Sequence, residues 1–235
     1  MTQEKHEAAE LLLANRLYLY SLLYKTFGRE PDGELLALLS ADTAGEAFAL
    51  LSAEKGDPLD RVGPFLSGLS AKKDDPAFLD ALKSEYVRLF VGPDKLVAPP
   101  WESVYRGEDA MLFQEVTLEV RETYRGFGLL PEGYPHVADD SLALELGFMA
   151  KLAERAMEDL HAGDELGLGR LLESSEDFLK KHLLLWIPKF LERMQKAKTQ
   201  LMYPQLCVVL DAFLKRDREV LGELRAALEE SGEQA

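Results

Sequence analysis

The chain has 235 residues, of which 47% are hydrophobic and 29% are charged, and its formal net charge is −15. This length is enough for one large domain or two small ones, with a full hydrophobic core and no need of covalent staples. The strong negative charge argues against nucleic acid and anionic membrane surfaces as partners, because both require a basic surface, whereas it is compatible with a basic partner.

The single cysteine, Cys207, excludes a disulfide framework and a cysteine-based metal site within one chain, and it favours a reducing compartment. Because Cys207 lies in an apolar run, we expect a small buried side chain there. Residues 1–10 are acidic and polar, unlike a secretory signal. The apolar stretch 11–24 is too short to span a bilayer and contains Asn15 and Arg16. We therefore expect a cytoplasmic protein with no stable membrane insertion.

Helical periodicity, caps and breaks divide the first half of the chain into helices joined by short turns. The sequence predicts helices over residues 4–27, 32–39, 42–52, 58–69 and 76–90. Gly28 and Pro31 are the expected stop signals of the first helix, and Asp42 is the expected N-cap of the third. Asp75 and Pro76 predict the N-cap and first helical residue of the fifth, which should end at the Gly92-Pro93 break.

The second half of the chain has the same character. It predicts helices over residues 108–125, 141–161, 164–185, 200–214 and 218–229. Pro188 should kink or restart the helix around it. Residues 129–138 contain two prolines and a glycine, which predicts a connector and a possible hinge. Since no alternating strand pattern and no fixed repeat is present, the sequence predicts an all-α, single-domain bundle of about ten helices.

The wide gap in the helical pattern, residues 91–107, carries Pro99, Pro100, Trp101 and Tyr105. The two prolines remove two backbone donors and push the preceding residues toward extended geometry, so this segment is not helix interior. Two interpretations stay open. The loop is stapled to the core by its own aromatic side chains, or it forms a rigid wall beside a binding groove.

Two adjacent carboxylates, Asp139 and Asp140, precede the helix that is predicted to start near Ser141. One interpretation makes them N-cap and dipole partners of that helix. The alternative is that they receive guanidinium groups from a ligand, for which paired carboxylates offer bidentate geometry.

Glu145 lies within the apolar arc of the same helix, at about 100° per residue. An unpaired charge on a buried face is very costly, so Glu145 needs a partner. Arg88 and Arg16, both in apolar stretches, are candidate internal partners. Alternatively, Glu145 lies on the floor of a groove and meets a cation of another molecule. Trp186, in a continuous apolar run, is expected in the core.

The sequence offers no recognisable catalytic or cofactor site. His6, His136, His161 and His182 form no i, i+4 pair, and no Glu-x-x-His motif is present, so each is expected to be a surface or structural residue. No glycine-rich phosphate loop follows a strand, and no nucleophile elbow occurs. We therefore predict no enzyme, no catalytic residue, no metal and no cofactor.

Three blocks of sequence carry a resemblance to a known family. Residues 88–93 (RLFVGP) followed by residues 98–105 (APPWESVY) resemble the TorD/DmsD family of redox-enzyme maturation chaperones. Residues 138–149 are similar to the family's second block, Glu-Pro-Asp-Asp-His followed by Glu-Leu. The residues that match it are Asp139, Asp140, Glu145 and Leu146, and those that depart from it are Val137, Ala138 and Ser141. Residues 182–188 resemble a third, weaker block, and the resemblance spans most of residues 80–215.

The resemblance implies an all-helical, non-enzymatic chaperone. Members of the family bind the twin-arginine signal peptide of a molybdenum-cofactor oxidoreductase and hold the enzyme for cofactor insertion before export. Some bind guanine nucleotides weakly, and some exchange halves between protomers through the connector that matches residues 129–138, so a monomer or a domain-swapped dimer is expected. Ser141 replaces a histidine implicated in partner binding. The peptide-binding residues that the resemblance and the patterns above suggest are Arg88, Pro99, Pro100, Trp101, Ser103, Tyr105, Asp139, Asp140, Ser141 and Glu145.

Other functions stay open at this point. One is an assembly chaperone like the delta subunit, serving a cytoplasmic or membrane-associated molybdoenzyme of the nitrate reductase type without reading a twin-arginine pair. A generic helical interaction scaffold and a nucleotide-handling enzyme are further alternatives. For the twin-arginine reading, we expect the 91–107 loop and the start of the helix near residue 140 to form one cleft.

Overall fold

The computed structural model describes residues 2–52, 55–93, 95–107, 115–131, 137–199 and 201–232. Within these ranges the chain forms helices and one isolated antiparallel bridge, between Trp101 and Ser141, and it forms no strand. The predicted all-α fold class is confirmed, whereas the assignment to one domain stays a prediction. None of the helices in these ranges is both long enough and apolar enough to cross a membrane.

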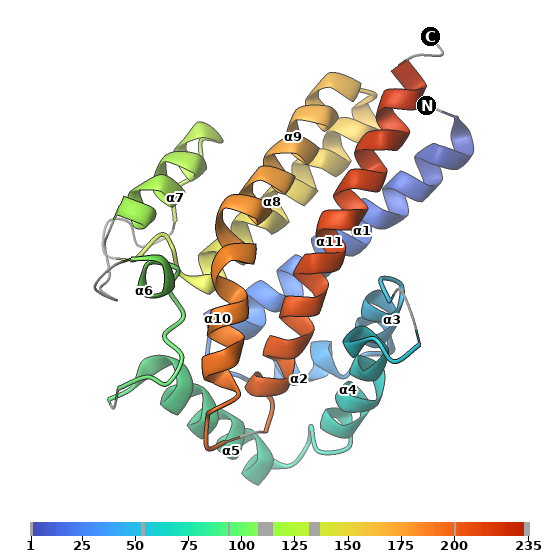
Figure 1. The fold of residues 1–235 in the computed structure, drawn as a ribbon. Coiled ribbons are helices and arrows are strands. Elements are labelled where there is room, and N and C mark those ends of the chain that lie inside the picture. Colours follow the sequence, from blue (N-terminus) through green and yellow to red (C-terminus); the bar gives the residue numbers. More distant parts are fainter. Residues whose placement is uncertain are drawn as a thin grey trace.

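Four long helices form the bundle, and they lie side by side in Figure 1, with both ends of the chain at the same end of the bundle. They are α1 (Gln3–Gly28), α8 (Leu142–Ala162), α9 (Glu165–Phe178) and α11 (Tyr203–Gly232). One cluster of buried apolar side chains runs through them. Cys207 and Trp186 are fully buried in it, as expected, and burial raises the pKa of the Cys207 thiol well above its usual value.

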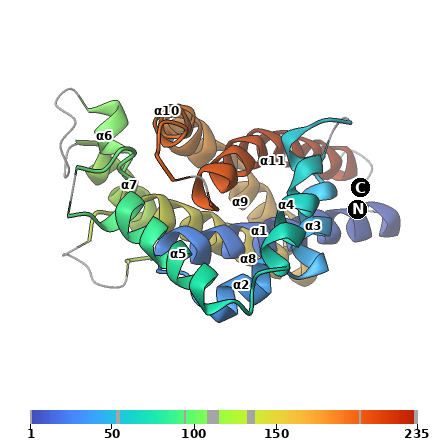
Figure 2. The same ribbon diagram turned by 90° about the horizontal axis from the view of Figure 1, so that it is seen from below.

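The N-terminal half completes the molecule with shorter helices, seen from below in Figure 2. They are α2 (Gly33–Leu39), α3 (Asp42–Ala49), η1 (Pro58–Arg61), α4 (Val62–Ser70) and α5 (Pro76–Tyr86). Asp75 caps α5 as predicted, because its side chain accepts a hydrogen bond from the Ala77 amide. The helix continues into the π-helical turn η2 (Val87–Val91) and ends where Gly92 adopts a φ of 100°, as the Gly-Pro break predicts.

Two predicted helix ends differ from the structure by one or two residues. The N-cap of α3 is Ala41, and Asp42 is the first helical residue. Gly28 is the last residue of α1 and Arg29 is its C-cap, in an extended conformation. A glycine is needed at the end of a helix when the backbone there becomes left-handed. Neither Gly28 nor Arg29 has a positive φ, so the end of α1 does not require a glycine.

Pro188 acts as predicted on the helix around it. The chain passes from α9 through a π-helical turn, η3 (Leu179–Leu183), and restarts as α10 (Leu184–Met194). A proline ring clashes with the carbonyl four residues earlier, and because proline has no backbone N–H, that carbonyl also loses the donor it would have bonded to. For Pro188 that carbonyl belongs to Leu184, where the α-helical pattern resumes after the interruption.

The prediction of two closing helices is wrong, because residues 203–232 form the single helix α11. The polar stretch around Asp217 is not a break. Its buried carboxylate accepts hydrogen bonds from Arg16 Nε at 2.5 Å and Nη2 at 3.1 Å, and from the Tyr20 hydroxyl at 2.7 Å. This contact lies between α1 and α11, so the charged residues there bind the first helix of the bundle to the last.

Two helices lie at one side of the bundle: α6 (Ser103–Arg106) and α7 (Glu115–Gly126). Figure 1 shows α7 set apart from the four long helices. Its backbone approaches α6, and its Tyr124 ring packs on Phe148 of α8 at a centroid distance of 4.8 Å. The first residues of the predicted helix 108–125 and the centre of the predicted hinge 129–138 lie outside the described residues.

Candidate functional site

The proline-rich loop pairs directly with the start of α8. The Leu142 amide donates to the Pro100 carbonyl at 2.9 Å, and the Glu102 amide donates to the Asp140 carbonyl at 2.9 Å. These two bonds flank the bridge between Trp101 and Ser141. Pro99 and Pro100 have no backbone N–H to donate, although the Pro100 carbonyl can still accept. The loop therefore forms backbone hydrogen bonds with the start of α8 over only a few residues. Trp101 and Asp140 therefore lie next to each other.

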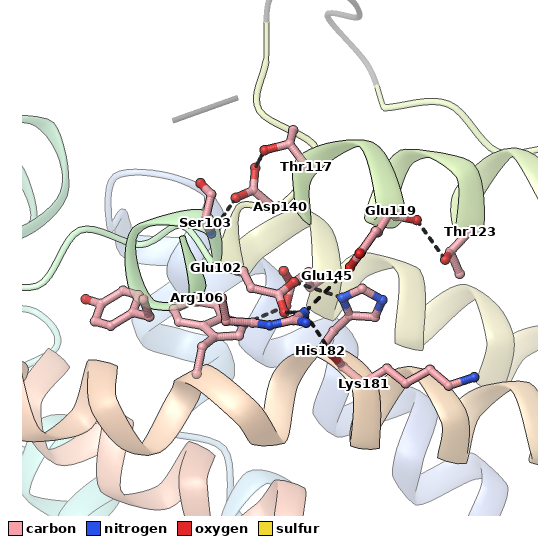
Figure 3. Close-up of polar contacts among 12 residues, drawn as sticks. Glu102, Ser103, Arg106, Thr117, Glu119, Thr123, Asp140, Glu145, Lys181 and His182 are labelled. Atoms are coloured by element: carbon pink, nitrogen blue, oxygen red, sulfur yellow. Dashed lines mark hydrogen bonds and ion pairs between the residues drawn. The ribbon is translucent and has the colours of Figure 1, made fainter. Parts of the chain in front are cut away.

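Asp140 is buried and bound on both oxygens. Its Oδ2 accepts from the Ser103 amide at 2.8 Å and its Oδ1 from the Thr117 hydroxyl at 2.9 Å, as Figure 3 shows. The N-cap of α8 is Ser141, whose hydroxyl accepts from the Leu144 amide at 3.4 Å. The capping role expected for the two aspartates thus belongs to the next residue, and Asp140 instead joins α6 and α7 to the start of α8.

Asp139 is also buried, and it is the main ionic link to α7. Its Oδ2 accepts from Arg121 Nε at 2.9 Å and Nη2 at 2.7 Å, and its carbonyl accepts from the Tyr124 hydroxyl at 3.1 Å. Among the described residues no donor reaches its Oδ1, which is buried. Asp139 therefore holds a guanidinium of this chain itself, whereas Asp140 holds none.

A second carboxylate pair lies behind the first. Glu102 accepts from Arg106 Nη1 at 2.6 Å and contacts His182 Nδ1 at 2.9 Å, and Figure 3 shows it between these two side chains with Glu145 beside it. The Trp186 indole donates to Glu145 Oε2 at 3.0 Å. Burial, and then the neighbouring Glu102 charge, raises the pKa of Glu145 well above its ordinary 4.5. Among the described residues no hydrogen-bond partner reaches Glu145 Oε1, which is buried, so this carboxyl holds its proton more tightly than a free glutamate does.

The expected partners of Glu145 are therefore wrong. Arg16 pairs with Asp217 at the other side of the core, and Arg88 is exposed. Arg88 lines a separate surface pocket with Glu30 and Lys83, and the structure does not bring it to the other candidate residues. In place of a cation, Glu145 accepts a hydrogen bond from the Trp186 indole.

Tyr105 belongs to the core rather than to an open wall. Its ring stacks on Trp186 at a centroid distance of 5.4 Å and an interplanar angle of 30°, and the Arg193 guanidinium lies 4.5 Å from its centroid. Burial raises the pKa of its phenol. Ser103 is fully buried, while Trp101 is half-buried. For Tyr105 the aromatic staple interpretation fits the geometry.

An apolar cavity of about 390 Å³ opens between α1, α8 and the end of α7. Its lining consists of Leu17, Ser21, Tyr24, Lys25, Tyr124, Leu129, Leu130, Pro131, Leu144, Gly147, Phe148, Ala150, Lys151 and Glu154. Tyr24 and Leu130 are 43% and 59% exposed, which is unusual for large apolar side chains that share one hollow. A Cβ on Gly147 would lie 3.1 Å from the Tyr24 ring, so the glycine permits this close approach.

Tyr124 joins this cavity to the aspartate pair. Its ring lines the cavity while its hydroxyl binds the Asp139 carbonyl. Trp101 is not part of the lining, so the loop expected to be one wall of the cleft lies beside the aspartates and not in the cavity. The walls are α1, α8 and the chain that follows α7.

Sequence reasoning missed four residues of this region: Glu102, Thr117, Arg121 and His182. Glu102 directly follows Trp101 in the conspicuous loop, and that position was the available signal. The others are ordinary polar residues on helices, and only folding brings them to the carboxylates. Among the described residues, no group of three or more His, Cys, Asp and Glu side chains has a geometry that would hold a metal ion.

Comparisons with known proteins agree with this architecture. The model of the nitrate reductase delta subunit family matches residues 50–192, which is more than half of the chain. The chaperone protein TorD of Vibrio cholerae serotype O1 (strain M66-2) is 30% identical over 143 residues, covering 61% of this chain and 63% of that protein. The chain thus matches less than two thirds of that relative's length.

Other relatives extend the match. TorD of Shewanella pealeana (strain ATCC 700345 / ANG-SQ1) is 25% identical over 214 residues, which cover 88% of this chain and 89% of that protein. The Tat proofreading chaperone DmsD of Salmonella typhi is 33% identical over 113 residues, or 48% of each chain. The resemblance found in the three sequence blocks is confirmed by these relatives, which are TorD and DmsD chaperones, and the chain belongs to the nitrate reductase delta subunit family.

Proposed function

We propose that this protein is a maturation chaperone of a molybdenum-cofactor oxidoreductase. It binds the twin-arginine signal peptide of that enzyme in the cytoplasm and holds the enzyme for cofactor insertion before export. The names of its relatives and the net charge of −15 support this function, because a leader with two arginines and an apolar run is basic and hydrophobic.

One observation carries the proposal: an exposed apolar cavity and a buried acidic pair meet at one side chain, Tyr124. The apolar run of the leader occupies the cavity against Tyr24 and Leu130, and the arginines reach Asp139 at the start of α8. Pro100, Trp101 and Ser141 shape that end of the site. Arg88 is left out of the proposed site because of its separate location.

Estimates of binding free energy indicate that the apolar cavity and the aspartates contribute differently to leader binding. Burying about four apolar side chains contributes roughly 6–12 kcal/mol, whereas association and ordering cost about 4–15 kcal/mol. Apolar contact alone is therefore close to the threshold of binding. Guanidinium–carboxylate bonds then decide affinity and choice of partner.

Titration calorimetry with three synthetic leaders tests the proposal. The first leader has the arginine pair, the second has two lysines in its place, and the third keeps the arginines but replaces the apolar run with serines. We expect the first to bind at least about tenfold more tightly than the second, a difference of about 1.4 kcal/mol, and the third not to bind measurably. Equal affinity for arginine and lysine leaders would count against carboxylate readout.

A second candidate follows from the matching family. It is a delta-subunit-like assembly chaperone for an enzyme of the nitrate reductase type, which binds its client without reading an arginine pair. The description of the family and the replacement of the family's histidine by Ser141 favour it. In the same calorimetry, this candidate gives equal binding of the arginine and lysine leaders and loss of binding only with the serine leader.

A further inference from the structure

The guanidinium of Arg121 already occupies the acidic site that the proposed function assigns to a leader arginine. Both Arg121 Nε and Nη2 donate to the same oxygen of Asp139, at 2.9 and 2.7 Å. The Asp139 side chain is fully buried, while that of Arg121 keeps 17% exposure. The contact thus reproduces, inside the molecule, the bond that a bound arginine would make.

The helix that carries Arg121 is attached to the bundle by a small set of buried side chains, Val116, Thr117, Val120 and Tyr124. α7 lies at the side of the molecule, its backbone approaches α6, and its polar links to the start of α8 run through Asp139 and Asp140. The same helix carries Tyr124, whose ring covers part of the apolar cavity. Releasing Arg121 would therefore loosen the helix that places Tyr124 in the lining of the cavity.

We propose that Arg121 is an autoinhibitory stand-in for the leader's arginine: it satisfies Asp139 in the empty chaperone, and a guanidinium of the leader displaces it. This inference rests on the proposed function and adds how that site is regulated. The displacement exchanges one guanidinium–carboxylate pair for another, so the buried carboxylate is never left without a cation.

The device also selects arginine. A lysine ammonium is a single, strongly hydrated point charge and cannot reproduce the fork of two donors that Arg121 presents. It therefore competes poorly with Arg121 for Asp139. In most molecules Arg121 is paired with Asp139, and only the fraction in which this pair is broken can bind a leader arginine there. The apparent affinity for a leader is therefore the intrinsic affinity multiplied by that fraction.

The test compares two substitutions on α7. Arg121→Gln removes the stand-in, and Arg125→Gln removes the same charge one turn further on, where the side chain is exposed and pairs with Glu122. Calorimetry with the arginine leader is expected to give about tenfold tighter binding for Arg121→Gln than for wild type, and unchanged binding for Arg125→Gln. Arg121→Lys, which keeps the charge and loses the fork, is expected to lie between, and it serves as the second variant should Arg121→Gln fold poorly.

The outcomes distinguish the autoinhibitory role of Arg121 from the proposed binding of a twin-arginine leader. If wild type prefers the arginine leader to the lysine leader but neither Arg121 variant binds it more tightly, the autoinhibitory role is wrong and Arg121 only holds α7 in place. If Arg125→Gln also binds the arginine leader more tightly, the gain comes from the loss of one positive charge and not from freeing Asp139, and the inference is overturned. If wild type shows no preference between the leaders, the twin-arginine function itself fails, and the inference with it.

Discussion

Two arginine–aspartate pairs of the same chemistry sit in different surroundings. Arg16 and Asp217 are both fully buried between α1 and α11, the first and last helices of the bundle, and Tyr20 adds a third bond. Arg121 and Asp139 join a helix at the side of the molecule to the start of α8, with the arginine partly open to water. Both members of the first pair are shielded from water, so this pair is structural, whereas the 17% exposure of the Arg121 side chain is what the proposed exchange requires.

The change with the greatest predicted cost breaks the pair of Arg16 and Asp217, which we call the bundle pair. Arg16→Met leaves the Asp217 carboxylate buried without its cation, and we expect the free energy of unfolding to fall by about 3–5 kcal/mol. Urea denaturation followed by circular dichroism measures it. The double variant Arg16→Met with Asp217→Leu should recover much of the loss, because no buried charge is then left unpaired. A single variant within about 1 kcal/mol of wild type would show that the pair is not isolated from water.

The corresponding change in the pair of Arg121 and Asp139, the edge pair, should lower the stability less. We expect Arg121→Gln to lower the free energy of unfolding by about 1–3 kcal/mol, since water can reach Asp139 when α7 separates locally. Native-state hydrogen exchange should locate the change: faster exchange in residues 115–126 and unchanged protection in α1 and α11. Equal loss of protection throughout the bundle would erase the difference between the two pairs.

A third prediction addresses the cavity beside the edge pair. Tyr24→Ala removes a half-exposed ring from its wall, so we expect leader affinity to fall about tenfold, or about 1.4 kcal/mol, with little change in stability. The control is Leu11→Ala on the same helix, which removes an exposed apolar side chain outside the cavity. Equal loss of affinity in both variants would remove the cavity from the binding site.

The weakest of these effects concerns Glu145, the buried carboxyl behind the aspartates, whose pKa is raised. Because the folded-state pKa of Glu145 is raised above its ordinary 4.5, the unfolded chain releases this proton at lower pH than the folded one. The contribution of this group to stability is therefore full below about pH 4.5 and is lost as pH rises toward the folded pKa. Glu145→Gln keeps an acceptor for the Trp186 indole and cannot ionise, so at pH 8 we expect it to be more stable than wild type by about 1 kcal/mol.

Denaturation series from pH 5 to pH 9 measure this difference, with the exposed Glu158→Gln on the same helix as control. The gap between Glu145→Gln and wild type should widen with pH, while that between Glu158→Gln and wild type should stay constant. A gap independent of pH would mean that Glu145 is ionised in the folded protein.

Part of the candidate site could be predicted from the sequence. The proline-tryptophan loop and the paired aspartates were singled out, and the bridge between Trp101 and Ser141 brings them together. Their partners could not be predicted, because Arg121 and Thr117 look like ordinary polar positions of an amphipathic helix. The cavity was missed for a similar reason: its walls come from α1, α8 and the segment after α7, and each wall alone reads as a normal apolar helix face.

The sequence by itself determined the all-α class, the start of α5 at Pro76 and its end at Gly92-Pro93, because caps, prolines and helical periodicity act within a few residues. Which charges meet depends on how the helices pack. Arg16 and Asp217 are 201 residues apart and Glu102 and His182 are 80 apart, so no local pattern pairs them. A buried polar group must find its partner wherever the packed helices put one. The break expected near Asp217 is therefore a contact with Arg16 and Tyr20, and Glu145 bonds to the Trp186 indole instead of a cation.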